Sequence, residues 1–174
     1  PIMQDTIESD LTDYVLDMAS SNEGLKLSNR GGFQSQHFQK PEKEFQDLWE
    51  QIEVKLNKYH QKVALKAHVQ IIEWWFNVNY KGCMNRQHQH PNSVHSGVYY
   101  VKAPENCGNI CFPNPNETIM WGWPGVLIKT QNMMNSGIAT LKPIKNLLYI
   151  FPSWANHSVD ANESDEPRIS LSFN

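Results

Sequence analysis

The sequence of 174 residues lacks any apolar run that approaches the roughly 20 residues a membrane-spanning helix needs. Its first residues also lack the basic and then apolar layout of a secretory signal peptide. No segment is repeated and no tract is of low complexity. These absences favour a single globular domain over a membrane protein or a repeat array.

Cysteine and net charge are also scarce. Three cysteines, an odd number, stand at no zinc-finger spacing: Cys83, Cys107 and Cys111. We expect reduced thiols in a cytoplasm, and a Cys107–Cys111 disulfide in an oxidising compartment is the alternative. Lys and Arg total 15 against 18 for Asp and Glu, which gives a formal net charge of −3. This balance offers no electrostatic basis for binding nucleic acid or an anionic membrane.

What is present is a globular composition, with 40% apolar and 19% charged residues. Residues 5–18 carry apolar side chains at a spacing close to one face of a helix. From Pro41 a second helix carries an apolar stripe that extends to Tyr59. We therefore expect one domain over residues 1–174, with a helical part at 1–62 whose two helices pack on one face of a β-rich core at 63–174.

The β-rich core is predicted from short runs of β-branched and aromatic residues, separated by Gly, Pro and Asn. The candidate strands are residues 70–80, 96–102, 109–112, 125–130, 138–141, 146–151, 157–159 and 168–173. About eight short strands at this spacing predict a mainly β fold, either a barrel or a two-sheet jelly roll.

A His-x-His pair is the most informative motif. In an extended strand the side chains at i and i+2 share a face, so His88 and His90 can direct two imidazoles at one point. The alternative is a pair of surface histidines. His157 follows an apolar strand and an aromatic turn, and it is either a strand-end residue or the distant third ligand of a facial metal site with open positions.

The last candidate strand combines an arginine with serines. Arg168, Ser170 and Ser172 share one face, and apolar residues occupy the other. A buried guanidinium requires an anionic partner. The carboxylate of a small ligand, held by Arg168 and the Ser170 hydroxyl, would serve, and an internal salt bridge to Asp or Glu is the alternative.

Four stretches taken together resemble the iron(II)- and 2-oxoglutarate-dependent oxygenases, in particular small members from marine phages and bacteria. They are His88-x-His90-Pro91, residues 96–101 (SGVYYV), residues 151–154 (FPSW) with His157, and Arg168-Ile169-Ser170. Residues 28–35 and 74–77 share in the resemblance, which covers nearly the whole chain. The order of these stretches is also similar to that of prolyl hydroxylases.

The resemblance implies a double-stranded β-helix that uses iron(II), 2-oxoglutarate and molecular oxygen. By position, it implies that His88 and His157 bind iron. It also implies that Arg168 binds the far carboxylate of 2-oxoglutarate, with a further hydrogen bond from Tyr100 or Ser170.

The chain departs from the superfamily at one ligand position, where His90 replaces an Asp or Glu. A set of three imidazoles is chemically reasonable for iron(II), so we expect His88, His90 and His157 to form the metal site. An acidic residue from elsewhere, such as Asp160, is the alternative second ligand.

The remaining histidines and tryptophans receive ordinary interpretations. We expect His95 at a turn or rim, and His37, His60 and His68 at the surface. The six tryptophans are expected to be mostly core residues, although Trp121 and Trp123 lie in a loop that could face a substrate.

The implied activity is hydroxylation of a substrate that the sequence does not identify. A peptidyl proline, an amino acid, a nucleobase or a small metabolite would fit. The alternatives are a cupin-like three-histidine dioxygenase that needs no 2-oxoglutarate and a non-enzymatic jelly roll that binds a metal or another ligand. A homodimer is one assembly compatible with the sequence.

Overall fold

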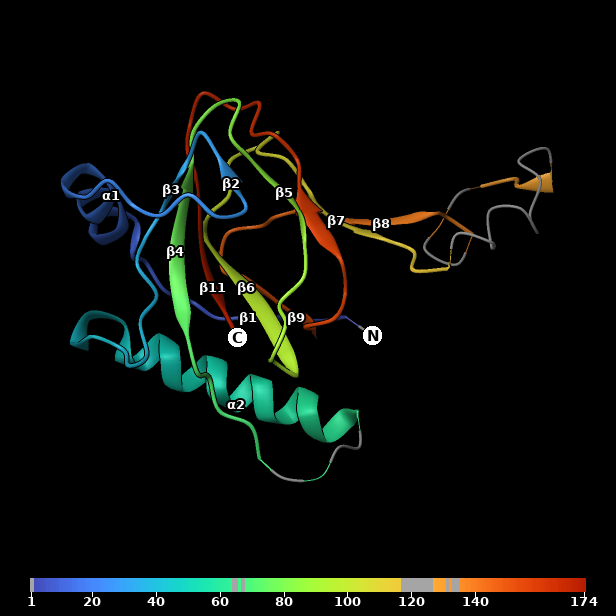
Figure 1. The fold of residues 1–174 in the computed structure, drawn as a ribbon, viewed down its shortest axis with the longest axis horizontal. Helices are drawn as coiled ribbons and strands as arrows, with labels where there is room; N and C mark the ends of the chain where they lie inside the picture. Colours follow the sequence, from blue (N-terminus) through green and yellow to red (C-terminus); the bar gives the residue numbers. More distant parts are fainter. Residues whose placement is uncertain (1, 64–65, 67, 117–126, 131, 133–134) are drawn as a thin grey trace.

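The computed structural model describes residues 2–63, 66, 68–116, 127–130, 132 and 135–174. The N-terminal part contains helix α1 (Thr12–Ser21), a 3-10 turn η1 (Lys43–Phe45) and helix α2 (Gln46–Lys62) (Figure 1). The apolar stripe of α2 is buried as predicted, because Leu48, Trp49, Ile52 and Leu56 face the core. Within the described part of the chain, no helix has the length and apolar character that crossing a membrane requires.

The start of the first predicted helix is wrong. Residues 3–6 form a strand, β1 (Met3–Thr6), whose side chains alternate in exposure. This strand pairs antiparallel with β9 (Leu147–Pro152), so that Met3 lies opposite Ile150 and Thr6 opposite Leu147. The partner is more than 140 residues away along the chain, and the local helical spacing carries no signal of it.

Within the described residues, eleven strands form two sheets. The first sheet has six strands in the order β1, β9, β6 (His95–Lys102), β11 (Arg168–Phe173), β4 (Trp74–Asn79) and β3 (Phe33–Gln34). The second has five strands in the order β2 (Asn29–Arg30), β5 (Met84–His88), β10 (His157–Val159), β7 (Ile110–Pro113) and β8 (Ile138–Leu141). The two sheets face one another, as expected for the predicted jelly roll (Figure 1).

Both helices pack on the outer face of the six-stranded sheet, as predicted. Trp74 of β4 is fully buried there, with its ring centroid 4.5 Å from that of Phe45 and 5.7 Å from that of Trp49. Alternate residues of β4, β6, β9 and β11 complete this core, together with the stripe of α2 and Val15 of α1. The helices therefore close one face of the sheet, and the other face is left to line the space between the sheets.

Strand bounds differ from the prediction at several places. The strand expected at 70–80 begins at Trp74, and the short strands β2, β3 and β5 were not among the candidates. The strand expected at 125–130 lies partly outside the described residues, and residues 127–130 are not in a strand. Such short strands carry little periodicity, so their pairing is decided by partners distant in sequence.

Candidate metal centre

Three histidines converge between the two sheets, as predicted. His88 ends β5, His90 lies two residues beyond it, and His157 opens β10 directly opposite His88. One ligand atom from each lies within 4.8 Å of the other two. The ring centroids are 5.0 Å apart for His88 and His90, 4.3 Å for His88 and His157, and 5.1 Å for His90 and His157. Such spacing lets three imidazoles ligate a single cation.

The convergence does not come from simple strand alternation. The register between β5 and β10 shifts, with His157 opposite His88 and Val159 opposite Asn85. Three residue steps on β5 therefore face two on β10, which is a β-bulge. Asn85 and His88 consequently both line the space between the sheets. His90 lies beyond the strand, held by a 3.0 Å hydrogen bond from its backbone N–H to the carbonyl of Ser153.

The backbone fixes the orientation of two of the imidazoles. Nδ1 of His88 lies 2.7 Å from the carbonyl oxygen of Arg86, and Nδ1 of His157 lies 3.0 Å from that of Ala155. A carbonyl only accepts, so in both rings Nδ1 carries the proton. Nε2 is then the free lone pair in each ring, which is the usual arrangement for a metal-ligating histidine.

Burial keeps these histidines neutral. Burial lowers the pKa of His88. Burial and, next, the neighbouring His88 lower the pKa of His90 to about 4 and that of His157 to about 3. The rings of Phe151 and Phe112 lie 4.9 and 5.7 Å from that of His157. Neutral imidazole is the metal-binding form, so the site is ready to accept a cation near neutral pH.

No carboxylate joins this cluster among the residues that the structure describes. Asp160, the alternative acidic ligand, instead places Oδ2 3.4 Å from the Sγ of Cys111. All three cysteines are free and buried.

Arg168 lies at the start of β11 and is 1% exposed. Its Nη1 donates to three backbone carbonyls: that of Cys107, that of Asp160 at 3.2 Å, and that of Gly108 at 3.5 Å. Arg168 forms no ion pair within the described part of the chain, so the expected alternative of an internal salt bridge is not found. Its Nη2 is buried and has no hydrogen-bond partner among the residues that the structure describes.

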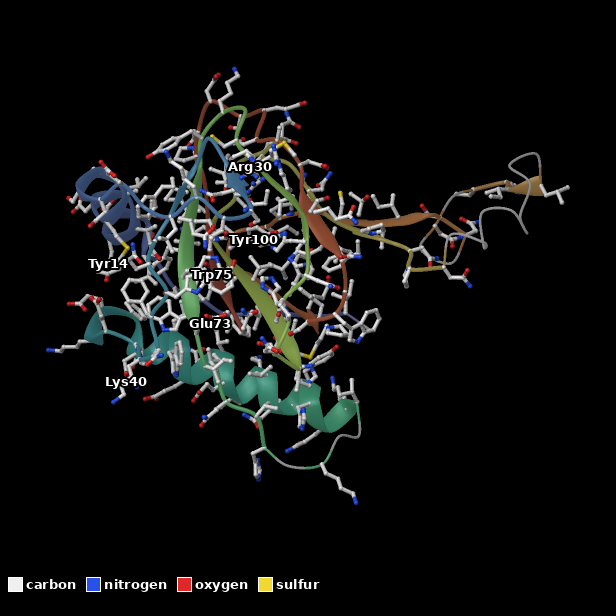
Figure 2. The ribbon with its side chains drawn as sticks, viewed as in Figure 1. Tyr14, Arg30, Lys40, Glu73, Trp75 and Tyr100 are labelled. Atoms are coloured by element: carbon white, nitrogen blue, oxygen red, sulfur yellow. The ribbon has the colours of Figure 1, made fainter. Side chains whose placement is uncertain are left out.

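A second unpartnered donor lies on the neighbouring strand. Tyr100 of β6 is 1% exposed and stands opposite Ser170 of β11, and its hydroxyl has no hydrogen-bond partner in the described part of the chain. Burial raises the pKa of Tyr100, so the hydroxyl remains protonated and able to donate. Figure 2 shows Tyr100 in the interior of the fold.

One cavity joins these groups. Arg168, Tyr100, Ser170 and Ser172 line it together with the three histidines, and its volume is about 40 Å³. Two buried donors without acceptors cost free energy unless an anion accepts from them. The arrangement therefore combines a cation site with an anion site in one enclosed space.

Several other predictions for single residues were wrong. His95 is not at a rim, and His60 is not at the surface. The two side chains are 7% and 4% exposed, with His60 Nδ1 2.9 Å from His95 Nε2. His37 and His68 are both exposed, as predicted, and the His37 ring also stacks on that of Trp75 with centroids 4.6 Å apart. Trp154 was expected in the core but is 65% exposed.

The loop tryptophans Trp121 and Trp123 lie outside the described residues. The sequence interpretation also missed residues that line the cavity on β4 and β5. Among these are Trp75, Asn77 and Asn85. Asn77 could have been predicted, because it lies opposite Ser170, and Ser170 shares one face of β11 with Arg168.

Residues 73–174, more than half of the chain, match the model of a family described as "Putative 2OG-Fe(II) oxygenase". That range contains the three histidines, Tyr100, Arg168 and Ser170. Among curated proteins, none matches the sequence.

Solved structures with a similar fold include three prolyl hydroxylases. The Pseudomonas putida prolyl-4-hydroxylase has a TM-score of 0.66 at 14% identity, over 99% of this chain and 90% of that one. A Trichoplax adhaerens prolyl hydroxylase, solved with a hypoxia inducible factor peptide, has a TM-score of 0.68 at 14% identity, over 99% and 81%. The viral collagen prolyl hydroxylase of Paramecium Bursaria Chlorella virus-1, solved with 2-oxoglutarate, has a TM-score of 0.62 at 15% identity, over 99% and 93%.

Proposed function

The chain belongs to the iron(II)- and 2-oxoglutarate-dependent oxygenases, and we propose that His88, His90 and His157 hold its iron. We propose in addition that Arg168 and Tyr100 bind the far carboxylate of 2-oxoglutarate, with Ser170 beside them. The enzyme is a 2-oxoglutarate-dependent dioxygenase of the hydroxylase type, and its cofactors are iron(II), 2-oxoglutarate and molecular oxygen.

The observation that carries this assignment is the pair of orphaned buried donors, Arg168 Nη2 and the Tyr100 hydroxyl, in the same cavity as three neutral imidazoles. A carboxylate would accept from both donors, and charge assistance strengthens such bonds. Imidazole nitrogen suits iron(II). The residues present therefore fit both groups that the family uses.

Together, the bound iron, 2-oxoglutarate and oxygen supply the oxidation of a substrate C–H bond, with 2-oxoglutarate converted to succinate and carbon dioxide. The protein's own residues do three things. His88 and His157 present Nε2 because their Nδ1 protons are held by backbone carbonyls. Arg168 is held in place through Nη1, which leaves Nη2 to orient a carboxylate. Phe151 and Phe112 exclude water from the His157 side.

The metal and cosubstrate roles can be separated by substitution. Purified variants would be compared for bound metal, for 2-oxoglutarate affinity in the presence of manganese, and for succinate formation that depends on 2-oxoglutarate. We expect His157→Ala to lose metal and, with it, turnover. Arg168→Met should keep the metal but weaken 2-oxoglutarate binding about a hundredfold, because the charge-assisted hydrogen bonds from the guanidinium to the carboxylate are lost.

His68→Ala is the matched control, since it removes an exposed imidazole. Arg168→Lys keeps a positive charge at this position, so it provides a second test if Arg168→Met fails to fold. Metal retained in His157→Ala, or an equal loss of metal and 2-oxoglutarate in both Arg168 variants, would contradict the assignment.

The wider setting of the enzyme also belongs to this proposal. We propose a single domain over residues 1–174, because the helices and the six-stranded sheet share one core. Free buried thiols at Cys83, Cys107 and Cys111 support a reducing cytoplasm. A homodimer also stays a prediction, which the mass of the protein in solution would check.

A further inference from the structure

A second hollow of about 400 Å³ opens beside the metal centre. Trp75, His88 and His90 line both this hollow and the metal cavity, so the two spaces adjoin. We call it the mouth, and its outer walls include Arg30, Gln34, His37, Glu73 and Arg86. These side chains come from both sheets, since Arg30 is on β2 and Arg86 on β5, whereas Gln34 is on β3 and Glu73 precedes β4. Figure 2 labels Arg30 near β2, and Trp75 and Glu73 beside β4.

The mouth carries two arginines without an anionic partner. Neither Arg30 nor Arg86 forms an ion pair within the residues the structure describes. Arg30 is anchored through Nη1 alone, which donates to the carbonyls of Leu27 at 2.9 Å and Asn29 at 2.7 Å. Arg86 is exposed, and its neighbour Gln87 belongs to the same β-bulge that turns His88 inward. The β2–β5 side of the mouth is therefore positively charged.

Glu73, which supplies the carboxylate of the mouth, is already hydrogen-bonded within the protein. Oε1 of Glu73 accepts from Asn174 Nδ2 at 2.7 Å, and Oε2 lies 2.9 Å from Nδ1 of His37. Burial works against ionisation of Glu73, but the bonds from Asn174 and His37 outweigh it and lower its pKa. Glu73 thus stays ionised and paired within the protein, and it does not neutralise the arginines.

Gln34 offers an acceptor to which no donor among the described residues is bonded. The His37 ring donates from Nδ1 to Glu73, so its Nε2 is left to accept from the Gln34 Nε2 amide 3.3 Å away. The other end of that amide, Oε1 of Gln34, is buried and has no partner, although the side chain is 2% exposed and lines the mouth. A buried acceptor without a donor is costly unless a ligand supplies one.

From these groups we infer that the primary substrate is a small molecule that carries both an anionic group and an N–H or O–H donor. The guanidinium groups of Arg86 and Arg30 bind the anion, and Oε1 of Gln34 accepts from the donor. The carbon to be oxidised then lies between them, next to His88 and His90. This inference rests on the proposed function, and it adds the class of substrate.

The pattern discriminates among the substrates that the sequence left open. Two cations and one acceptor on opposite walls suit a free amino acid, a hydroxy acid or a phosphorylated metabolite. These groups do not favour a proline within a neutral peptide, because such a peptide has no anionic group to pair with Arg30 and Arg86. Carboxylate and phosphate share the chemistry that an arginine recognises, so the experiment must tell these two sources apart.

The test measures 2-oxoglutarate-dependent succinate formation by the iron-loaded enzyme with four sets of probes. The first set is the free L-amino acids and 2-hydroxy acids, and the second is their carboxamides, which lack the carboxylate charge. The third is nucleoside and sugar monophosphates, and the fourth is an uncharged proline-containing peptide. We expect stimulation by members of the first or third set, and at least about tenfold less by counterparts without the anionic charge, since an ion pair with arginine is lost.

Variants then connect the active probe to the mouth. Arg86→Gln should raise the KM for the active probe about tenfold while the affinity for 2-oxoglutarate in the presence of manganese changes less than about twofold. Gln34→Met should raise that KM about fivefold, and Gln34→Glu, which keeps an acceptor oxygen, should raise it less. Lys62→Gln, the same charge change on an exposed residue of α2, is the control and should have no effect.

Three results would overturn the inference. They are equal stimulation by acids and their carboxamides, stimulation by the uncharged peptide alone, and no stimulation by any anionic probe. In each case binding of 2-oxoglutarate to the manganese-loaded protein shows whether the proposed function survives. If that binding is intact, only the substrate class is wrong, and if it is absent, the proposed function fails as well.

Discussion

The two faces of the six-stranded sheet differ in how their side chains are satisfied. The outer face, under α1 and α2, is apolar and closely packed, with Trp74, Phe76 and Val78 of β4 all fully buried. The inner face is offset from it by one residue along each strand and carries polar atoms that have no partner among the described residues, such as the Tyr100 hydroxyl and Nη2 of Arg168. On the outer face, Nε1 of Trp74 is also without such a partner. The outer face supplies stability, and the inner face retains unmet hydrogen bonds for ligands.

Strand β11 shows how one segment serves both purposes. Ile169, Leu171 and Phe173 belong to the outer core, whereas Arg168 and Ser170 line the metal cavity. Because the side-chain period of a strand is two, each residue is committed to one of the two faces. Substitutions on the two faces should therefore have different consequences, and three predictions examine this contrast.

The largest expected effect is on the outer face. Phe76→Ala removes a fully buried ring that contacts Phe45, Trp74 and Tyr14. We expect the free energy of unfolding to fall by about 3–5 kcal/mol, because both transfer energy and packing are lost. Urea denaturation followed by tryptophan fluorescence would measure the change.

The matched substitution on the inner face is Ser172→Ala, which removes a hydroxyl that accepts one 3.2 Å bond from Asn77. Its expected effect on the free energy of unfolding is within about 1 kcal/mol. Comparable losses for the two variants would show that the faces do not divide stability and ligand binding in this way.

A smaller effect of a different kind is expected for Tyr100→Phe. The substitution removes a buried hydroxyl that has no partner, so the free energy of unfolding without ligand should stay constant or rise by about 1 kcal/mol. The affinity for 2-oxoglutarate should nevertheless fall about tenfold, equivalent to about 1.4 kcal/mol. Calorimetric titration of the manganese-loaded variant would measure this, and an unchanged affinity would remove Tyr100 from the carboxylate site.

The smallest expected effect concerns pH. Burial, and then the neighbouring His60, lower the pKa of His95 in the folded protein, and Tyr59 also packs against its ring. In the unfolded chain histidine titrates near pH 6.5, so below that value the unfolded state binds more protons. The free energy of unfolding should therefore decrease as the pH falls, by at most about 1.4 kcal/mol per pH unit from this group.

His95→Gln should remove that contribution, so that the difference between wild type and variant narrows from about pH 7.5 to about pH 5.5. His68→Gln, at an exposed position, should leave the pH dependence of the wild type unchanged. A constant difference between wild type and His95→Gln would mean that His95 does not titrate in this range.

Local patterns predicted those parts of the fold that depend on near neighbours. The stripe of α2 and the alternation of β11 are readable because each needs only an apolar face and a fixed period. Strand β1 was missed because its partner, β9, follows it by more than 140 residues. His60 and His95 were misjudged for the same reason, since their pairing depends on how α2 lies on the sheet.

At the metal centre the sequence indicated which histidines meet, but not how. The spacing suggested that His88 and His90 lie on one continuous strand with alternating side chains. In the structure a bulge precedes His88, the strand ends at His88, and His90 lies just before a turn. The mouth was invisible in the sequence because Gln34, Glu73 and Arg86 lie on separate strands and segments with no shared motif. Such a site exists only once the two sheets face one another.

The strand order has a consequence for biosynthesis. β11 follows the other described strands along the chain, yet it is inserted between β4 and β6 in the middle of its sheet. Until residues 168–173 leave the exit tunnel, the nascent chain can neither join those two strands nor bury their apolar sides, and such long-range pairings form slowly. The six-stranded sheet is therefore completed only after synthesis of this segment, and a chain truncated before Arg168 should be prone to aggregate.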